Sequence, residues 1–254
     1  SFVASKMLRG RVEKLAVADY PATFRNPAFR GQVYRLVDLV LDVPSVIATL
    51  AGQQREAIFS IDWDTAALAV RDGDACIRLP HCTVVPRRLI LAAGIGNEKL
   101  IQDLGASAPA MQRRPLQQVL FRHQYREPLY AHCMGGNPSP RLTISSHHNS
   151  QGEPVWYLGG DLATEGTEDE PEVLIRKAQR ELAELLPWID FGDTEWRTVK
   201  LDRAEPRQSA LLRPDQAFVG ELDSVANAIA AWPTKLTLSP DLANSIEVLL
   251  QAQG

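Results

Sequence analysis

A glycine turn between an apolar run and a helix is the strongest local indication of a ligand site in this sequence. Leu89–Ala93 is uninterrupted apolar, which indicates a strand buried on both faces, and Gly94-Ile95-Gly96 leads to a helix that Asn97 can cap. Backbone N–H groups at such a helix start can meet a phosphate or another polar ligand edge. The third glycine of a dinucleotide fingerprint would stand at Lys99, so two interpretations stay open: a ligand contact, or only a tight turn.

A second polar turn, Thr237-Leu238-Ser239-Pro240, stands at the start of the last predicted helix. Ser239 can cap this helix, and Pro240 suits its first position. The partial positive charge of the helix start would favour an anionic ligand edge. Capping alone explains the same residues and is locally the better interpretation.

Histidines and arginines offer further candidate chemistry. His147 and His148 would point to opposite faces of a strand, and neither His123 nor His132 has the spacing of a zinc motif, so we predict no metal site. One or two arginines could bind a substrate carboxylate, although solvated charge is the default for each of them. The candidates are Arg113, Arg114, Arg141, Arg203 and Arg207.

The composition is that of an ordinary globular protein. The 254 residues are 45% apolar and carry a formal net charge of -4, which excludes disordered and collagen-like chains and gives no general case for nucleic acid or anionic membrane partners. The three cysteines show no CxxC spacing, and no uncharged run is long enough to span a bilayer. We therefore expect a reducing, cytoplasmic location; the oligomeric state is not predicted.

Periodicity predicts an α/β (α+β) fold whose main sheet is mixed and mainly antiparallel, with flanking helices. Apolar residues recur at helical spacing after Asp42 and from Pro171 to Leu186. Five strand-like segments lie between about 110 and 222: Pro115–Arg122, Leu129–Cys133, Arg141–Ser146, Pro154–Gly159 and Thr194–Arg203. Shorter β-like runs are Ala57–Ile61, Ala66–Val70, Ala75–Leu79 and Val225–Ala231, with a hairpin turn at Arg71–Asp74.

Four stretches resemble FAD-dependent oxidoreductases related to D-amino-acid oxidase. Arg87–Gly94 resembles the late FAD-contacting strand and turn of that superfamily, and Met111–Leu116, Val155–Gly160 and Ala231–Pro240 resemble a bacterial branch of it. The resemblance covers about Val33 to Leu250. It implies a partial FAD-binding region at 1–108, a substrate domain with an antiparallel sheet at 109–222, and a return to the FAD-binding region at 223–254.

The sequence departs from that superfamily in two places. Family members open with a βαβ unit whose GxGxxG turn holds the ADP half of FAD, and this sequence has no GxGxxG. We therefore expect a fragment of a longer flavoprotein, with FAD in the full-length protein and none tightly bound to this chain. Pro233-Thr234-Lys235-Leu236 also stands where the family normally offers glycines to the flavin.

The resemblance implies flavin contacts at Ala93, Gly94, Gly96, Thr234, Lys235, Leu236 and Thr237. It also implies a role for Lys235 in catalysis: a hydride leaves a substrate C–H bond for flavin N5, and the cation and the helix start after Ser239 stabilise the charge at N1 and C2=O. Arg114 and Tyr157 are the expected residues for holding a substrate carboxylate and closing the pocket.

The implied function is hydride transfer to FAD from a small amine, amino acid or hydroxy acid, so a small molecule is the expected partner. The isolated chain is expected to be inactive. A non-catalytic α/β binding or assembly module without flavin is the alternative. The missing GxGxxG favours that alternative for this chain, whereas the strand, glycine turn and terminal helix favour a redox protein. Absorbance near 450 nm of the full-length protein distinguishes the two.

Overall fold

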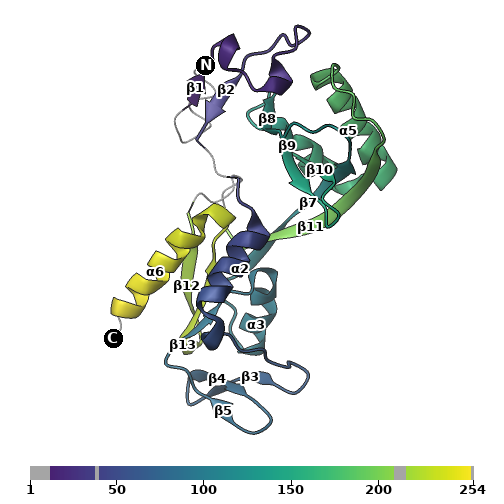
Figure 1. Ribbon diagram of the computed structural model, residues 1–254. Coiled ribbons are helices and arrows are strands. Elements are labelled where there is room, and N and C mark those ends of the chain that lie inside the picture. Colours follow the sequence, from purple (N-terminus) through teal and green to yellow (C-terminus); the bar gives the residue numbers. More distant parts are fainter. Residues whose placement is uncertain (1–11, 38–39, 209–215, 253–254) are drawn as a thin grey trace. The chain divides into compact units, whose positions relative to one another are not determined.

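The computed structural model describes residues 12–37, 40–208 and 216–252, and the chain divides into two compact units (Figure 1). The first unit comprises residues 1–40 and 115–201, and the second comprises 41–114 and 202–254. Both units combine helices with mostly antiparallel strands, so the predicted α+β fold class is confirmed. No helix in the described ranges has the length and apolar character that crossing a bilayer requires.

A five-stranded sheet forms the first unit, in the order β11-β7-β10-β9-β8. Its strands are β7 (Met111–Arg122), β8 (Tyr130–Met134), β9 (Pro140–His148), β10 (Pro154–Gly159) and β11 (Glu195–Pro206). The pairs β7/β10, β10/β9 and β9/β8 are antiparallel. All five predicted strands are present within a few residues of their predicted ends, since the turn-rich stretches between them mark where each strand stops.

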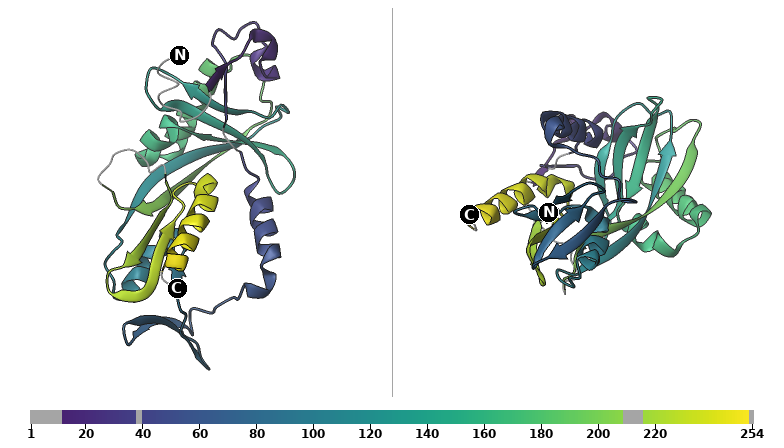
Figure 2. Two further views of the ribbon diagram at one scale, coloured as in Figure 1. Left: turned by 90° about the vertical axis from the view of Figure 1, so that its left-hand side faces the viewer. Right: turned by 90° about the horizontal axis from the view of Figure 1, so that it is seen from below.

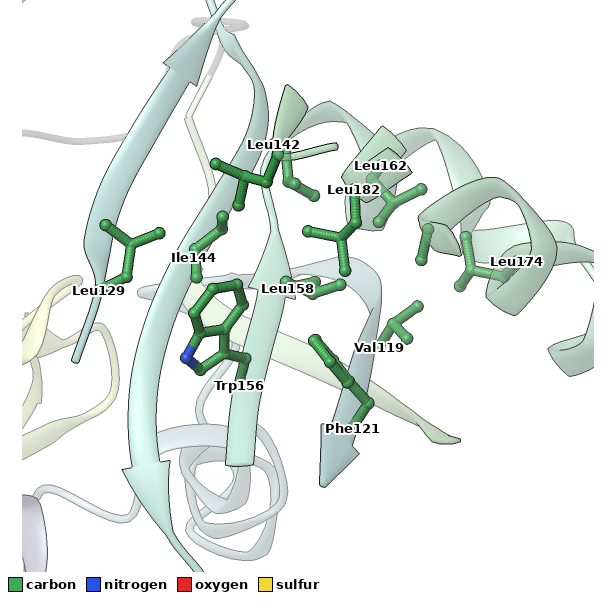
Figure 3. Close-up of a cluster of buried hydrophobic side chains, with 12 residues drawn as sticks. Val119, Phe121, Leu129, Leu142, Ile144, Trp156, Leu158, Leu162, Leu174 and Leu182 are labelled. Carbon is green, nitrogen blue, oxygen red and sulfur yellow. The ribbon is translucent and has the colours of Figure 1, made fainter. Parts of the chain in front are cut away.

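One face of this sheet is covered by α5 (Pro171–Leu185), with α4 (Asp161–Glu165) at its side. Figure 3 shows side chains from β7, β9 and β10 directed toward those of the helices. Trp156 and Leu174 are 1% and 0% exposed, because alternate strand residues and every third or fourth helix residue meet there. The predicted helix from Pro171 is confirmed.

The N-terminal segment packs in the first unit. It contains β1 (Val12–Lys14), β2 (Tyr34–Leu36) and the short 3-10 turns η1 (Val17–Asp19) and η2 (Ala22–Phe24). The indole N–H of Trp188 donates to Thr23 O over 2.8 Å, and the hydroxyls of Thr23 and Tyr125 are 3.0 Å apart. These contacts lie within the first unit, and the placement of residues 1–108 in a flavin-binding region stays a prediction.

The second unit contains a three-stranded sheet in the order β12-β13-β6. β13 (Val225–Trp232) runs parallel to β6 (Leu89–Leu91) and antiparallel to β12 (Phe218–Leu222). Ile101 of α3 (Asn97–Asp103) and Leu91 share one buried cluster. The C-terminal α6 (Ser239–Ala252) lies along β12 (Figure 2).

A smaller sheet in this unit consists of β3 (Ala67–Arg71), β4 (Asp74–Arg78) and β5 (Thr83–Val84). The predicted hairpin turn is confirmed, with Asp72 and Gly73 at φ 54° and 90°. The helix predicted after Asp42 is α2 (Val43–Gln53).

Two predictions in the second unit are wrong. Ala57–Ile61 is no strand: its first residue ends the 3-10 turn η3 (Arg55–Ala57), and Phe59 is 81% exposed, since no neighbouring strand offers it a pairing edge. The strand predicted at Leu89–Ala93 ends at Leu91 and is not buried on both faces. Ile90 is 36% exposed because β6 is an edge strand that α3 covers on one side only.

Candidate functional site

The parallel pair β6/β13 brings together two turns that are far apart in the sequence. Parallel strands have their carboxyl ends at the same edge of a sheet, which is where ligands bind in α/β folds. β6 leads into the 3-10 turn η4 (Gly94–Gly96), and β13 leads into Pro233 and Lys235. The indole N–H of Trp232 donates to Gly94 O over 3.0 Å, which joins the two turns directly.

The glycine turn needs its glycine. Gly94 has φ +60°, in the left-handed region that L side chains rarely adopt, and nothing lies within 4 Å of a Cβ placed there. Ala93 is exposed, and Ile95 is 45% exposed. The turn therefore presents backbone and small apolar groups to open space.

Asn97 does not cap α3 as predicted. Gly96 is the residue before the helix, and the side chain of Asn97 turns inward to 0% exposure. Its Oδ1 accepts the Ala93 N–H over 2.8 Å, and its Nδ2 donates to Ala231 O over 3.1 Å. The Asn97 amide points inward because the N–H of Ala93 and the C=O of Ala231 both need hydrogen-bond partners.

The second turn is strained at the buried Thr234 and exposed at the three residues that follow it. Thr234 has φ +59°, which is rare for a β-branched residue, and its hydroxyl donates to Gln216 O over 3.0 Å. Lys235 and Thr237 are exposed, and Leu236 is 44% exposed. The helical conformation already begins at Leu236, in the 3-10 turn η6 (Leu236–Leu238) that continues into α6.

This earlier start corrects the predicted cap. Ser239 has φ -61° and ψ -37°, so it is a helical residue and not a cap. The positive end of the helical segment therefore comes directly after Lys235. Among the described residues no carboxylate forms an ion pair with the Lys235 ammonium, which leaves a local excess of positive charge.

The candidate arginines mostly have protein partners. Arg114 donates to Glu205, whose side chain is 2% exposed, and Gln112 Nε2 donates to the same carboxylate over 2.7 Å. Arg113 pairs with Glu98, and Arg141 binds carboxylates of α5. The role of Arg114 as a substrate ligand stays a prediction, beside this structural role.

Tyr157 lies on the face of the five-stranded sheet opposite α5. Its neighbours Trp156 and Leu158 point into the core, so alternation places Tyr157 on the other side. The ring of His147 packs on it with centroids 4.3 Å apart, and His147 Nε2 is 2.9 Å from Ser145 Oγ. Burial, then the charge of neighbouring His148, lowers the pKa of His147 below its usual value.

Ser145 and His147 are candidate residues that the sequence interpretation missed. That interpretation considered His147 as a metal ligand, whereas the residue is half-buried against Tyr157; His148 is exposed. The pairings Tyr157 with Ser145 and Val155 with His147 in the β10/β9 register bring these residues together. The alternation along each strand indicates in the sequence which residues share a face. The register between the strands, which decides the pairs, cannot be derived from the sequence pattern.

Comparison with known proteins places the chain in a family. No family model matches it. The probable FAD-dependent oxidoreductase PA4991 of Pseudomonas aeruginosa is 43% identical over 257 residues, which cover 100% of this chain and 64% of that protein. The crystal structure of PA4991 has a TM-score of 0.85 at 39% identity, covering 98% of this chain and 69% of that one. This chain belongs to the FAD-dependent oxidoreductases.

Two solved structures of lower identity share the fold. Iminodiacetate oxidase from Chelativorans sp. BNC1 gives a TM-score of 0.55 at 15% identity, covering 95% of this chain and 63% of that chain. The amino acid oxidase NikD gives 0.59 at 17% identity, covering 95% and 65%. The chain thus covers 63% to 65% of the length of PA4991 and these two oxidases.

The residues of the two turns fit the ring end of the family's cofactor. A flat ring system needs a close backbone approach and apolar contact, which the open space at Gly94 and the exposed Ile95 and Leu236 supply. Lys235 offers a cation at the same edge. The ADP half of FAD needs other groups, since no GxGxxG turn occurs in this chain.

Proposed function

We propose that this chain supplies the flavin-ring contacts and the substrate-binding sheet of an oxidoreductase that oxidises a small amine, amino acid or hydroxy acid. The observation that carries the proposal is the junction of the Gly94 and Lys235 turns at one edge of the β6/β13 pair. FAD, when bound, supplies the acceptor for a hydride from the substrate. The assigned flavin contacts are Ala93, Gly94, Gly96, Thr234, Lys235, Leu236 and Thr237.

Lys235 has an electrostatic role in this proposal. A bound flavin would take up negative charge when it is reduced, and the ammonium of Lys235 would stabilise that charge. The helical turn that starts at Leu236 adds its partial positive charge on the same side. The backbone of this turn is already held by Thr234 and its bond to Gln216, so the start of the helical turn needs little reorganisation.

The open sheet face of the first unit, around Tyr157, is the proposed source of substrate contacts. Tyr157, His147 and Ser145 offer a hydroxyl, an imidazole and a second hydroxyl, and strands β8, β9 and β10 contain no aspartate or glutamate. The lack of carboxylates on these three strands suits an anionic group on the substrate. Burial lowers the pKa of His147 and so favours its neutral imidazole, which can donate or accept a hydrogen bond.

FAD retention is the first test. The pyrophosphate of FAD gains charge-assisted backbone contacts from a GxGxxG turn, so we expect the isolated chain to hold no FAD tightly. A fusion with the part of PA4991 that this chain does not match should restore a protein with absorbance near 450 nm. Stoichiometric yellow colour in the isolated chain contradicts the first expectation, and a colourless, folded fusion contradicts the proposal.

Substrate class is the second test. The yellow fusion is mixed without oxygen with panels of amines, amino acids and hydroxy acids, and loss of the absorbance near 450 nm identifies the class that reduces it. The variants Tyr157→Phe and His147→Gln should slow this bleaching, whereas exposed His148→Gln should not. A yellow fusion that no panel bleaches would favour a non-catalytic binding module.

A further inference from the structure

Two hydrogen bonds join the Gly94 turn to the end of β13, and two more hold the Gly94 turn itself. The Asn97 side chain bonds Ala93 N–H over 2.8 Å and Ala231 O over 3.1 Å. Gly94 O accepts both the backbone N–H of Asn97 and the indole N–H of Trp232, the latter over 3.0 Å. Asn97 and Trp232 are 0% and 1% exposed, so water does not replace these bonds while the unit is folded.

These bonds lie where the two turns leave strands β6 and β13. Ala93 and Gly94 form the first turn, and Trp232 stands three residues before Lys235 in the second. Any shift of β6 against β13 would move the two turns apart, and the bonds oppose that shift at the end of the strands where both turns begin. Neither side chain is exposed at the site, so both act through the turns.

We propose that Asn97 and Trp232 are positioning residues that hold the Gly94 turn and the Lys235 turn in the one arrangement that contacts the flavin ring. This inference rests on the proposed function. The two buried side chains fix the distance between the turns that contact the flat ring. A small displacement at such a site lowers both affinity and rate. The strained Thr234 depends on the same support, since Trp232 anchors the strand from which it leaves.

The chain offers a matched control for each residue. Trp188→Phe removes an indole-to-carbonyl bond of 2.8 Å in the first unit, as Trp232→Phe does at the site. Asn227 is 4% exposed and accepts Ala75 N–H over 2.6 Å and donates to Pro86 O over 2.9 Å, near the start of β13. Asn227→Leu therefore removes the hydrogen bonds of an equally buried amide that lies outside the two turns.

Amide hydrogen exchange of the isolated chain is the first readout. Trp232→Phe keeps an aromatic ring and loses one hydrogen bond, so it should fold; about tenfold faster exchange is expected at Ala93, Lys235 and Leu238 together. Trp188→Phe should leave these three amides within twofold of wild type. If Trp232→Phe leaves Lys235 and Leu238 at the wild-type rate, the coupling of the two turns is refuted.

Flavin affinity is the second readout, one that a purely structural role would not move. Titration with FAD up to millimolar concentration, followed by flavin fluorescence, should show about tenfold weaker binding for Trp232→Phe and Asn97→Leu than for wild type. Asn227→Leu should bind as wild type does, even at equal loss of thermal stability. Equal affinity of all four proteins overturns the inference.

The two proposals fail in different ways. If neither the wild-type chain nor its PA4991 fusion binds FAD, the proposed function fails and the flavin role of Asn97 and Trp232 fails with it. The exchange rates still decide whether these residues couple the turns. If FAD binds the wild type but the Asn97 and Asn227 variants lose affinity equally, the proposed function stands and the positioning role is wrong.

Discussion

Arg114 donates through Nε to the carboxylate of Glu205, and this carboxylate is almost completely buried, with 2% of its side chain exposed. Gln112 donates to the same Glu205 oxygen over 2.7 Å. Burial of a carboxylate carries a desolvation cost, and the guanidinium and the amide offset this cost only while both are in place. Arg114 therefore has a measurable structural task in addition to the substrate role that its sequence context predicts.

Arg114→Met should lower the free energy of unfolding by about 1.5–3 kcal/mol, because the buried Glu205 loses its charged hydrogen-bond donor and keeps the neutral amide of Gln112. The double variant Arg114→Met, Glu205→Leu should recover most of this loss. Urea unfolding measures both, with Arg113→Met as the control; Arg113 is half-exposed, and its loss should have a much smaller effect. A fusion that keeps its stability after Arg114→Met but no longer binds a carboxylate substrate would assign Arg114 to the substrate instead.

Local periodicity predicted the strands and helices whose faces differ sharply in polarity. β10 has its predicted bounds because Pro154 and the glycines at 159 and 160 end its alternating run, and α5 starts at its predicted proline. Gly105, at φ +73°, follows the end of α3 and is the kind of residue that stops a helix. These features depend on residues that are near one another in the chain.

Features that depend on distant partners were not predicted from local pattern. Ala57–Ile61 has strand-like composition but no strand to pair with, and Asn97 has cap chemistry but finds better partners in Ala93 and Ala231. The bond between Gly94 and Trp232 joins residues 138 positions apart. No local spacing reveals such a pair, so the shared edge of the two turns was inferred from family resemblance alone.

His123 should make the first unit less stable in mild acid. The residue is 2% exposed among the rings of Phe121, Trp156 and Phe191, and burial lowers its pKa from 6.5 to about 4, with the backbone of Tyr125 opposing part of the shift. The unfolded chain therefore binds a proton more readily than the folded one between pH 6.5 and 4. Stability is full above pH 6.5 and falls by on the order of 3 kcal/mol as the pH drops to 4.

Thermal unfolding measured at pH 7, 5.5 and 4 checks this expectation. His123→Phe should remove most of the pH dependence in this window, whereas His132→Phe, at an exposed position, should keep it. An unchanged slope in His123→Phe would show that another group causes the acid loss.

Gly94→Ala should cost about 1–2 kcal/mol of unfolding free energy through its backbone alone. The φ of +60° is unfavourable for alanine, but nothing lies within 4 Å of the added Cβ. Gly52→Ala is the control, since Gly52 is in α2 without a positive φ and also has open space; this change should leave stability equal or up to about 1 kcal/mol higher. Equal urea midpoints for Gly94→Ala and wild type would mean that the turn is not left-handed in solution.

Lys235→Met should slow reduction of the FAD-loaded fusion far more than it weakens FAD binding. Lys235 is exposed at the start of the helical turn and has no ion-pair partner among the described residues, so its charge is available to a ligand at the edge of the β6/β13 pair. Loss of a fixed charge beside a developing anion costs on the order of 3 kcal/mol, or about a hundredfold in rate. Stopped-flow reduction at equal FAD occupancy measures this rate, with Lys99→Met as the control because Lys99 is already paired with Asp103 on α3. A Lys235→Met rate within twofold of wild type would identify Lys235 as an ordinary surface lysine, and a rate loss that only follows weaker FAD binding would assign it to cofactor affinity instead of catalysis.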